Sequence, residues 1–255
     1  MSKSMKLFLC FIVLLTGVAF GPLIAMGLTF SEVLSQPLGI ALFTLGCLAP
    51  ALSTVLTYVL DKTKGGLPQL WKDITAQTKK TTWLMMIYFL VLHYGLAFLM
   101  GFVADLGTFG DFLKALPIMF VLFGTQELGW RLMLQPALES YRGFWKGNIA
   151  LGMIISLWFL PLIYIPGFYF RADMYLVLAI YLVGVTLMQS TLRNQGGSIL
   201  TAAVFSTLHY SMLAIFSLVQ SSNLMVLLLI DGLMAFTFKS KIFKENRKEQ
   251  GLTKR

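Results

Sequence analysis

The sequence predicts an all-α protein, a polytopic bundle of about eight transmembrane helices with both termini in the cytoplasm. Three observations predict this class: hydrophobic residues make up 57% of the 255 residues, charged residues only 12%, and the mean hydropathy is +0.78. A soluble domain of this length has too little interior to bury so much apolar surface. The apolar runs are continuous rather than alternating, which excludes a membrane β-barrel.

Eight apolar segments come close to the length of about 20 residues that crosses a bilayer as a helix. They run roughly over residues 5–29, 37–60, 82–104, 113–138, 149–168, 174–192, 197–219 and 223–238, and the last is the shortest. We interpret residues 1–238 as a single integral membrane domain and residues 239–255 as a basic cytoplasmic tail. The first segment is longer than the apolar part of a typical signal peptide, so we expect a retained span.

The positive charges predict the orientation. Seventeen of the twenty Lys and Arg residues fall on one side of these segments: at the N-terminus, in the connections 61–81 and 139–148, at Arg193 and in the tail. Such a bias marks the cytoplasmic side, which places both termini there. It also accounts for the net charge of +9, and it favours contact with anionic membrane lipid rather than with nucleic acid.

The connection 61–81 carries an amphipathic pattern. Its apolar residues are spaced i, i+3, i+4 and i+7: Leu67, Leu70, Trp71 and Ile74. Pro68 suits the first turn of a helix, and lysines surround the pattern. We expect a short helix that lies in the cytoplasmic membrane interface.

Two charges lie near the middle of the segment 113–138, in the sequence Gln126-Glu127-Leu-Gly-Trp-Arg131. An isolated charge at that depth costs about 2.5–3.5 kcal/mol on insertion scales. Because Glu127 and Arg131 are four residues apart, they share a helix face and can neutralise each other, which would simply brace the bundle. The alternative is a functional cavity, since Trp158, Phe159 and His209 fall at a similar depth in other segments.

Other polar residues in the spans are isolated in the sequence. His93 lies in the third segment and Asp231 in the eighth. His209 could equally be a core histidine bonded to Ser206 or to a neighbouring helix. No two of the possible ligands have metal-ligand spacing on one helix, so we expect neither a metal site nor a cofactor.

The charged segment resembles a known motif. Gln126-Glu127-Leu-Gly-Trp-Arg131 is similar to the Glu-Glu-x-x-x-Arg motif of the CPBP intramembrane proteases, the group of CAAX prenyl endopeptidases and bacteriocin-processing or immunity proteins. Ser156-Leu-Trp-Phe159-Leu-Pro161 resembles the second motif of that family, a Trp-His-Leu-Pro segment. The stretch from Gly196 to His209 resembles the third, a Gly-Ser-led helix that ends in histidine. The resemblance covers about residues 60–215.

The sequence departs from the family at the positions that would carry the chemistry. The family's water-activating Glu is Gln126 here, and a carboxamide is not a useful base near neutral pH. The second-motif histidine is Phe159, and Leu213 stands where an oxyanion-stabilising Asn or Asp is common. Glu127, Arg131 and His209 remain. Glu127 could replace the missing base only if it turned, since adjacent helical positions point about 100° apart.

We therefore expect a CPBP-like protein whose proteolysis is impaired or lost. It would bind a hydrophobic or lipidated peptide or a membrane protein partner in the cavity inherited with the motifs. We expect an immunity or scaffold role in the bacterial cytoplasmic membrane. The competing hypothesis is an active glutamic-type intramembrane endopeptidase that uses Glu127 and His209 in a rearranged site. A small-solute transporter is the third class, but the sequence lacks the inverted repeats typical of it.

Overall fold

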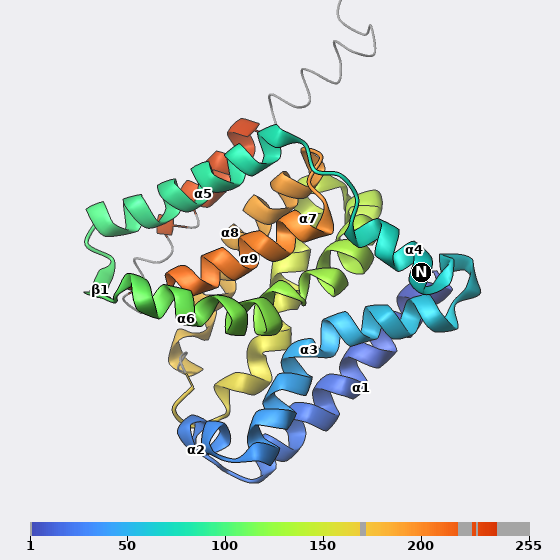
Figure 1. The fold of residues 1–255 in the computed structure, drawn as a ribbon, viewed down its shortest axis with the longest axis horizontal. Helices are drawn as coiled ribbons and strands as arrows, with labels where there is room; N and C mark the ends of the chain where they lie inside the picture. Colours follow the sequence, from blue (N-terminus) through green and yellow to red (C-terminus); the bar gives the residue numbers. More distant parts are fainter. Residues whose placement is uncertain (1, 169–171, 219–225, 228, 239–255) are drawn as a thin grey trace, which may run out of the picture.

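The structure, a computed structural model, describes residues 2–168, 172–218, 226–227 and 229–238, and it is dominated by helices (Figure 1). The longer helices are α1 (Lys3–Ala25), α3 (Pro37–Leu60), α5 (Lys80–Leu99), α7 (Gln135–Ile163) and α8 (Tyr175–Asn194). The shorter ones are α2 (Phe30–Ser35), α4 (Gly66–Ile74), α6 (Phe109–Met119), α9 (Ile199–Met212) and a last helix, Leu229–Phe238. The predicted basic tail, 239–255, lies outside the described residues.

Short elements complete this architecture. Two π-helical turns, η2 (Phe120–Gly124) and η3 (Leu128–Leu134), join α6 to α7, and single 3₁₀ turns occur at η1 (Lys62–Lys64) and η4 (Ala172–Met174). Two short strands, β1 (Val103–Leu106) and β2 (Phe216–Leu218), pair antiparallel and hold the end of α5 beside the end of α9. The predicted helical class is confirmed, with this small strand pair as the exception.

Five helical runs among the described residues are long and apolar enough to cross a membrane. They are Lys3–Ala25, Pro37–Leu60, Lys80–Leu99, Phe109–Ile163 and Tyr175–Asn194, and the apolar helices Ile199–Met212 and Leu229–Phe238 are shorter. The chain is thus built as a membrane protein. The count of eight spans and the cytoplasmic position of the termini stay predictions.

The long run Phe109–Ile163 contains the fourth predicted segment, 113–138, and most of the fifth, 149–168, and Gly143 divides it. Gly143 has φ +71° and ψ 175°, a backbone conformation that glycine adopts far more readily than other residues. Across this break the Asn148 Nδ2 donates to Glu139 Oε1 at 2.6 Å, and on its own side of the break it donates to the Phe144 carbonyl at 2.8 Å. The break falls inside the connection 139–148 that the sequence indicated.

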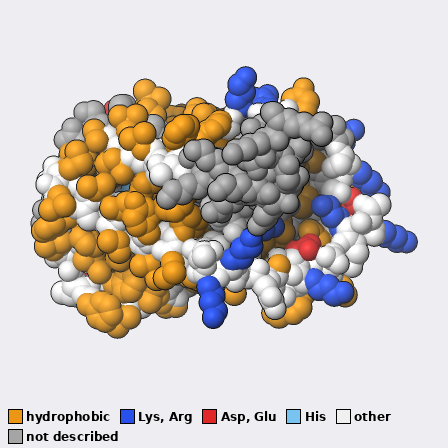
Figure 2. Space-filling view, turned by 90° about the horizontal axis from the view of Figure 1, so that it is seen from above, with side chains coloured by type: hydrophobic (Ala, Val, Ile, Leu, Met, Phe, Trp, Pro, Cys, Tyr) orange, Lys and Arg blue, Asp and Glu red, His pale blue; other side chains and the backbone are white. Residues whose placement is uncertain are grey.

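The helices are buried to very different degrees. In α8, 83% of the most apolar window is buried, whereas in α1 only 28% is. Helix α8 is therefore the centre of the bundle, packed chiefly on α7, while α1 packs on α3 at the periphery (Figure 1). On the face shown in Figure 2, apolar side chains cover one end and Lys and Arg gather toward the other, as expected for a membrane protein with a charged cytoplasmic side.

The amphipathic pattern of the connection 61–81 forms helix α4. Leu70 turns inward and is 5% exposed, whereas Leu67 and Trp71 are more than half exposed. Asp73 accepts a hydrogen bond from the Tyr58 hydroxyl at 2.7 Å, which ties α4 to the end of α3. The exposed pair of large apolar side chains fits a helix that rests on a membrane surface.

A polar contact holds α1 to the end of α3. The Ser4 hydroxyl, in the first turn of α1, donates to Asp61 Oδ2 at 2.5 Å, and Asp61 Oδ1 also accepts from the Thr63 hydroxyl at 2.7 Å. The hydrogen bond from Ser4, and then that from Thr63, lower the pKa of the Asp61 carboxyl. This contact adds a polar link to the apolar packing of α1 on α3.

We predict that this attachment weakens in acid. A carboxyl whose pKa is lowered in the folded state contributes stability at higher pH, and this contribution is lost as the pH falls through the folded pKa. The thermal stability of Ser4→Ala in detergent should therefore lie below that of the wild type at neutral pH, and the gap should shrink below about pH 4. Ser140→Ala, at an exposed serine bonded to a backbone carbonyl, is the control. A Ser4→Ala gap that stays constant with pH would contradict the assignment.

We also predict that Gly129 is required for the packing of the charged segment on α3. A Cβ atom on Gly129 would lie 2.7 Å from both the Cβ and the carbonyl oxygen of Pro50. Gly129→Ala should therefore lower the free energy of unfolding by about 1–3 kcal/mol, the usual effect of overpacking. Gly95→Ala, a helical glycine with open space around its Cβ position, is the matched control in a thermal unfolding measurement. Equal stability of the two variants would contradict this account.

Candidate functional site

The site begins with the local winding of the segment around Gln126. The π-helical turns η2 and η3 flank Gln126 and Glu127 on both sides, and π-helical turns are frequent at functional sites. Both side chains are buried, with 3% and 5% of their surface exposed. The spacing of an α-helix predicts that these neighbours point in different directions. In the structure both residues line one cavity, but their polar groups have different partners: the Gln126 amide bonds Trp130, whereas the Glu127 carboxylate bonds Arg131.

Glu127 and Arg131 form a buried ion pair. Arg131 Nε donates to Glu127 Oε2 at 2.7 Å, and the two side chains are 6% exposed or less. The other carboxylate oxygen, Oε1, accepts from the Ser206 hydroxyl of α9 at 2.6 Å and from Gln189 Nε2 of α8 at 3.1 Å. Both oxygens of Glu127 are thus occupied by donors from three elements.

Arg131 is held by side chains of several elements. Besides Glu127, its guanidinium donates to Ser190 at 2.8 Å, to Gln135 at 3.4 Å and to Gln189 Oε1. Its side chain is fully buried. Every contact is a charge-assisted hydrogen bond, the strong kind, so the charge is neutralised by Glu127 and solvated by amides and a hydroxyl.

The network continues into the N-terminal half of α7. The Ser190 hydroxyl donates to Asn148 Oδ1 at 2.6 Å, and Asn148 in turn donates to Glu139. Glu139 also accepts from Gln135 at 2.9 Å and from Asn194, at the end of α8, at 3.0 Å. An unbroken path of hydrogen bonds therefore runs from Ser206, through the ion pair, to the exposed end of the bundle.

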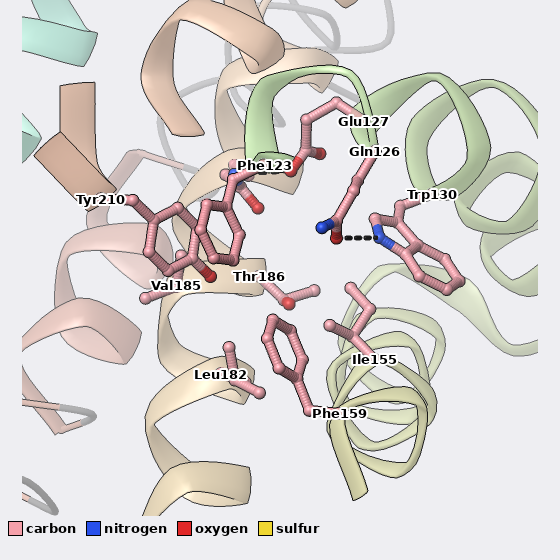
Figure 3. Close-up of a pocket in the computed structure, with 11 residues that line it drawn as sticks. Phe123, Gln126, Glu127, Trp130, Ile155, Phe159, Leu182, Val185, Thr186 and Tyr210 are labelled. Carbon is pink, nitrogen blue, oxygen red and sulfur yellow. Dashed lines mark hydrogen bonds between the residues drawn. The ribbon is translucent and has the colours of Figure 1, made fainter. Parts of the chain in front are cut away.

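The cavity beside this network is small (Figure 3). Its volume is about 10 Å³, which is the size of a single water site. Eleven residues line it: Phe123, Gln126, Glu127, Trp130, Ile155, Phe159, Leu182, Val185, Thr186, Gln189 and Tyr210. A peptide does not fit such a cavity without movement of the helices.

The two substituted motif positions face each other across this cavity (Figure 3). The Gln126 amide is occupied on its own helix: its Nε2 donates to the Leu122 carbonyl at 2.5 Å, and its Oε1 accepts from Trp130 Nε1 at 3.4 Å. Phe159 stacks on Phe123, with ring centroids 6.2 Å apart and planes 11° from parallel. The structure thus brings together one position of the first motif-like segment and one of the second, and these are occupied by the Gln126 amide and the Phe159 ring.

His209 does not line the cavity, although its neighbour Tyr210 does. Its Nε2 lies 2.8 Å from the Tyr181 hydroxyl, and its ring stacks on Phe205. On its other side lies His93, with ring centroids 5.1 Å apart. The histidine therefore belongs to a separate aromatic cluster, on the side of α9 that faces α5 and α8.

This arrangement is poorly suited to activating a water molecule. The only carboxylate at the cavity, Glu127, is saturated by donors, and taking up a proton would break its pair with Arg131. Within the described part of the chain, no group of three His, Cys, Asp or Glu residues is arranged to hold a metal ion. What the site does provide is a rigid polar connection among α7, α8, α9 and η3.

Sequence reasoning missed the residues that hold the ion pair. Gln189 and Ser190 lie in the predicted span 174–192, and Ser206 lies in the span 197–219. Polar residues at mid-depth in two further spans were the available signal, because a buried ion pair needs hydrogen-bond partners for its remaining donors and acceptors. The sequence analysis considered Ser206 only as a partner of His209.

Comparisons with known proteins do not extend the resemblance stated above. No profile of a known protein family matches the chain, and no curated protein matches it significantly.

We predict that Glu127 and Arg131 stabilise the fold as a unit. Arg131→Met leaves the Glu127 carboxylate buried and unpaired, so unfolding should become easier by about 3–5 kcal/mol. Glu127→Gln alone should also destabilise, while the double variant should be more stable than the sum of the single changes predicts, by about 0.5–3 kcal/mol. Thermal unfolding in detergent measures all four proteins, and strictly additive effects would show that the pair is not coupled.

Proposed function

We propose that this chain is a CPBP-like integral membrane protein in which the protease motif has become structural. It binds a hydrophobic or lipidated peptide or a membrane protein partner, in an immunity or scaffold role. In this proposal the chain crosses the bacterial cytoplasmic membrane eight times, with both termini in the cytoplasm.

One observation carries the proposal: the carboxylate that remains in the motif is fully engaged by Arg131, Gln189 and Ser206. A general base contributes about 10²–10⁴-fold to catalysis only when its lone pair can reach the reacting proton. Gln126 offers no such lone pair near neutral pH, and Phe159 offers no hydrogen-bonding atom. The motif residues support the bundle instead.

The size of the cavity supports binding on another surface. A volume of about 10 Å³ admits one water molecule and no side chain of a substrate. Hydrophobic partners in a membrane instead dock on helix faces that meet lipid, and α1 and α5 present such faces, with Val13 72% and Leu84 68% exposed.

The active-endopeptidase alternative requires Glu127 and His209 to act together. Their contacts are separate: Glu127 bonds Ser206 and lines the cavity, whereas His209, one turn further along α9, bonds Tyr181 and does not line the cavity. A rearrangement of α9 would be needed before both could reach one scissile bond, so we favour the binding role.

We predict that the wild type does not cleave prenylated or hydrophobic leader peptides in proteoliposomes, yet is labelled by a photoreactive form of the same peptides. Gln126→Glu combined with Phe159→His restores the two substituted motif positions and tests whether the scaffold still supports catalysis. Phe159→Leu is the matched control, since it opens a similar space without a titratable group. Cleavage by the wild type that disappears in a folded Glu127→Gln variant would contradict the proposal and establish an enzyme.

A further inference from the structure

Helix α4 lies between the ends of two candidate membrane spans. Helix α3 ends at Leu60 and α5 begins at Lys80, and both are long and apolar enough to cross a bilayer. Figure 1 shows α4 in the connection between them, at the edge of the bundle. In the last turn of α3, Val59 and Leu60 are about half exposed, as expected for side chains that meet lipid. Because a connection between two successive spans stays on one side, α4 lies at a membrane surface in either orientation of the chain.

Contacts with the bundle fix the direction in which α4 faces. Leu70 is buried, and Asp73 accepts a hydrogen bond from the Tyr58 hydroxyl of α3. Leu67 and Trp71, one helical turn apart, are 53% and 67% exposed. The two side chains form an apolar strip that the described part of the chain leaves uncovered. Tryptophan on such a strip is typical of a helix that lies at the level of the lipid headgroups.

Five lysines lie on α4 or on the residues that flank it: Lys62, Lys64, Lys72, Lys79 and Lys80. All except Lys64 are exposed, and the Lys64 nitrogen lies 5.5 Å from the centre of the Tyr58 ring. Within the part of the chain that the structure describes, none of the five forms an ion pair with an acidic side chain. The positive charges of this connection are therefore available to an anion outside the protein.

The acidic residues of the same connection are engaged within the protein. Residues 61–81 contain two aspartates against the five lysines, which leaves a net charge of +3. Asp61 is 2% exposed and accepts a hydrogen bond from Ser4 of α1 at 2.5 Å. Asp73 accepts from Tyr58 at 2.7 Å. Both carboxylates are thus directed to hydroxyl donors of the bundle, and the surface that α4 presents outward combines positive charge with apolar area.

We propose that α4 and its lysines form a docking surface for anionic phospholipids. Leu67 and Trp71 enter the boundary between headgroups and acyl chains, while the lysine ammonium groups bind the lipid phosphates. Lysine suits this role, because its stem can lie along apolar area while its charge stays in the headgroup layer. Binding there anchors the junction of α3 and α5 to anionic lipid. The site needs only the connection 61–81, so it does not depend on the proposed binding role.

Quenching of Trp71 fluorescence by brominated lipids tests the surface on the whole chain. The protein is reconstituted into phosphatidylcholine vesicles that contain a minor share of brominated phosphatidylglycerol or of brominated phosphatidylcholine. The signal of Trp71 is the difference between the wild type and Trp71→Phe. We expect phosphatidylglycerol to quench Trp71 at a share at least about fivefold lower than phosphatidylcholine, the effect of one lysine at an anionic surface. Equal quenching by the two lipids would overturn the proposal without any lysine variant.

Removal of charge isolates the role of the lysines. The combined variant Lys62→Gln, Lys72→Gln and Lys80→Gln changes three exposed positions and keeps polar side chains there. Its preference for phosphatidylglycerol should fall to near that for phosphatidylcholine. Lys114→Gln, at an exposed lysine of α6, is the matched control and should behave as the wild type. An undiminished preference in the triple variant would overturn the assignment of the lysines.

Salt and free phosphate distinguish a lipid surface from a soluble anion. A roughly tenfold increase in salt shortens the range of exposed charges about threefold, so the preference for phosphatidylglycerol should fall. Inorganic phosphate at the same ionic strength should lower it no more than chloride does, because it makes no contact with Leu67 and Trp71. A much stronger effect of inorganic phosphate would assign the lysines to a soluble anion and overturn the lipid surface.

Discussion

The Arg131 guanidinium is the group on which the architecture of the bundle depends. It is fully buried, and the bundle must supply a counter-ion and hydrogen-bond acceptors wherever it lies. Glu127 supplies the charge from the adjacent turn, and Gln189 and Ser190 supply acceptors from α8. Helix α8, which supplies these acceptors, is also the most buried of the five candidate spans in the described residues.

The form of the cavity follows from the same constraint. Once Glu127 is committed to Arg131, Gln189 and Ser206, the space in front of Gln126 has no free base, and Phe159 fills its opposite wall. Activation of a water molecule in this space would need both a free carboxylate and a larger opening. The chain instead uses the same positions to fasten α7, α8, α9 and η3 to one another.

Much of the fold could be predicted from the sequence, because hydrophobic runs report helices directly. The runs 37–60 and 174–192 match α3 and α8 closely, and the amphipathic spacing around Leu70 predicted α4. The partners of individual side chains were harder to predict. His93 and Asp231 are separated by 138 positions, and no periodicity relates them. The π-helical turns also carry no pattern in composition, so η2 and η3 could not be predicted.

The π-helical turns η2 and η3 make the direction of the Arg131 side chain sensitive to the number of residues that precede it. A π turn spans more residues than an α turn, so each one is equivalent to a residue added to an ordinary helix. Two such additions before and around Arg131 rotate the charged segment relative to α6. Deleting one residue there would rotate the residues that follow by about 100°, so Arg131 would no longer face Gln189 and Ser190. This segment must therefore keep its number of residues, which sets the direction of Arg131, as well as its amino-acid composition.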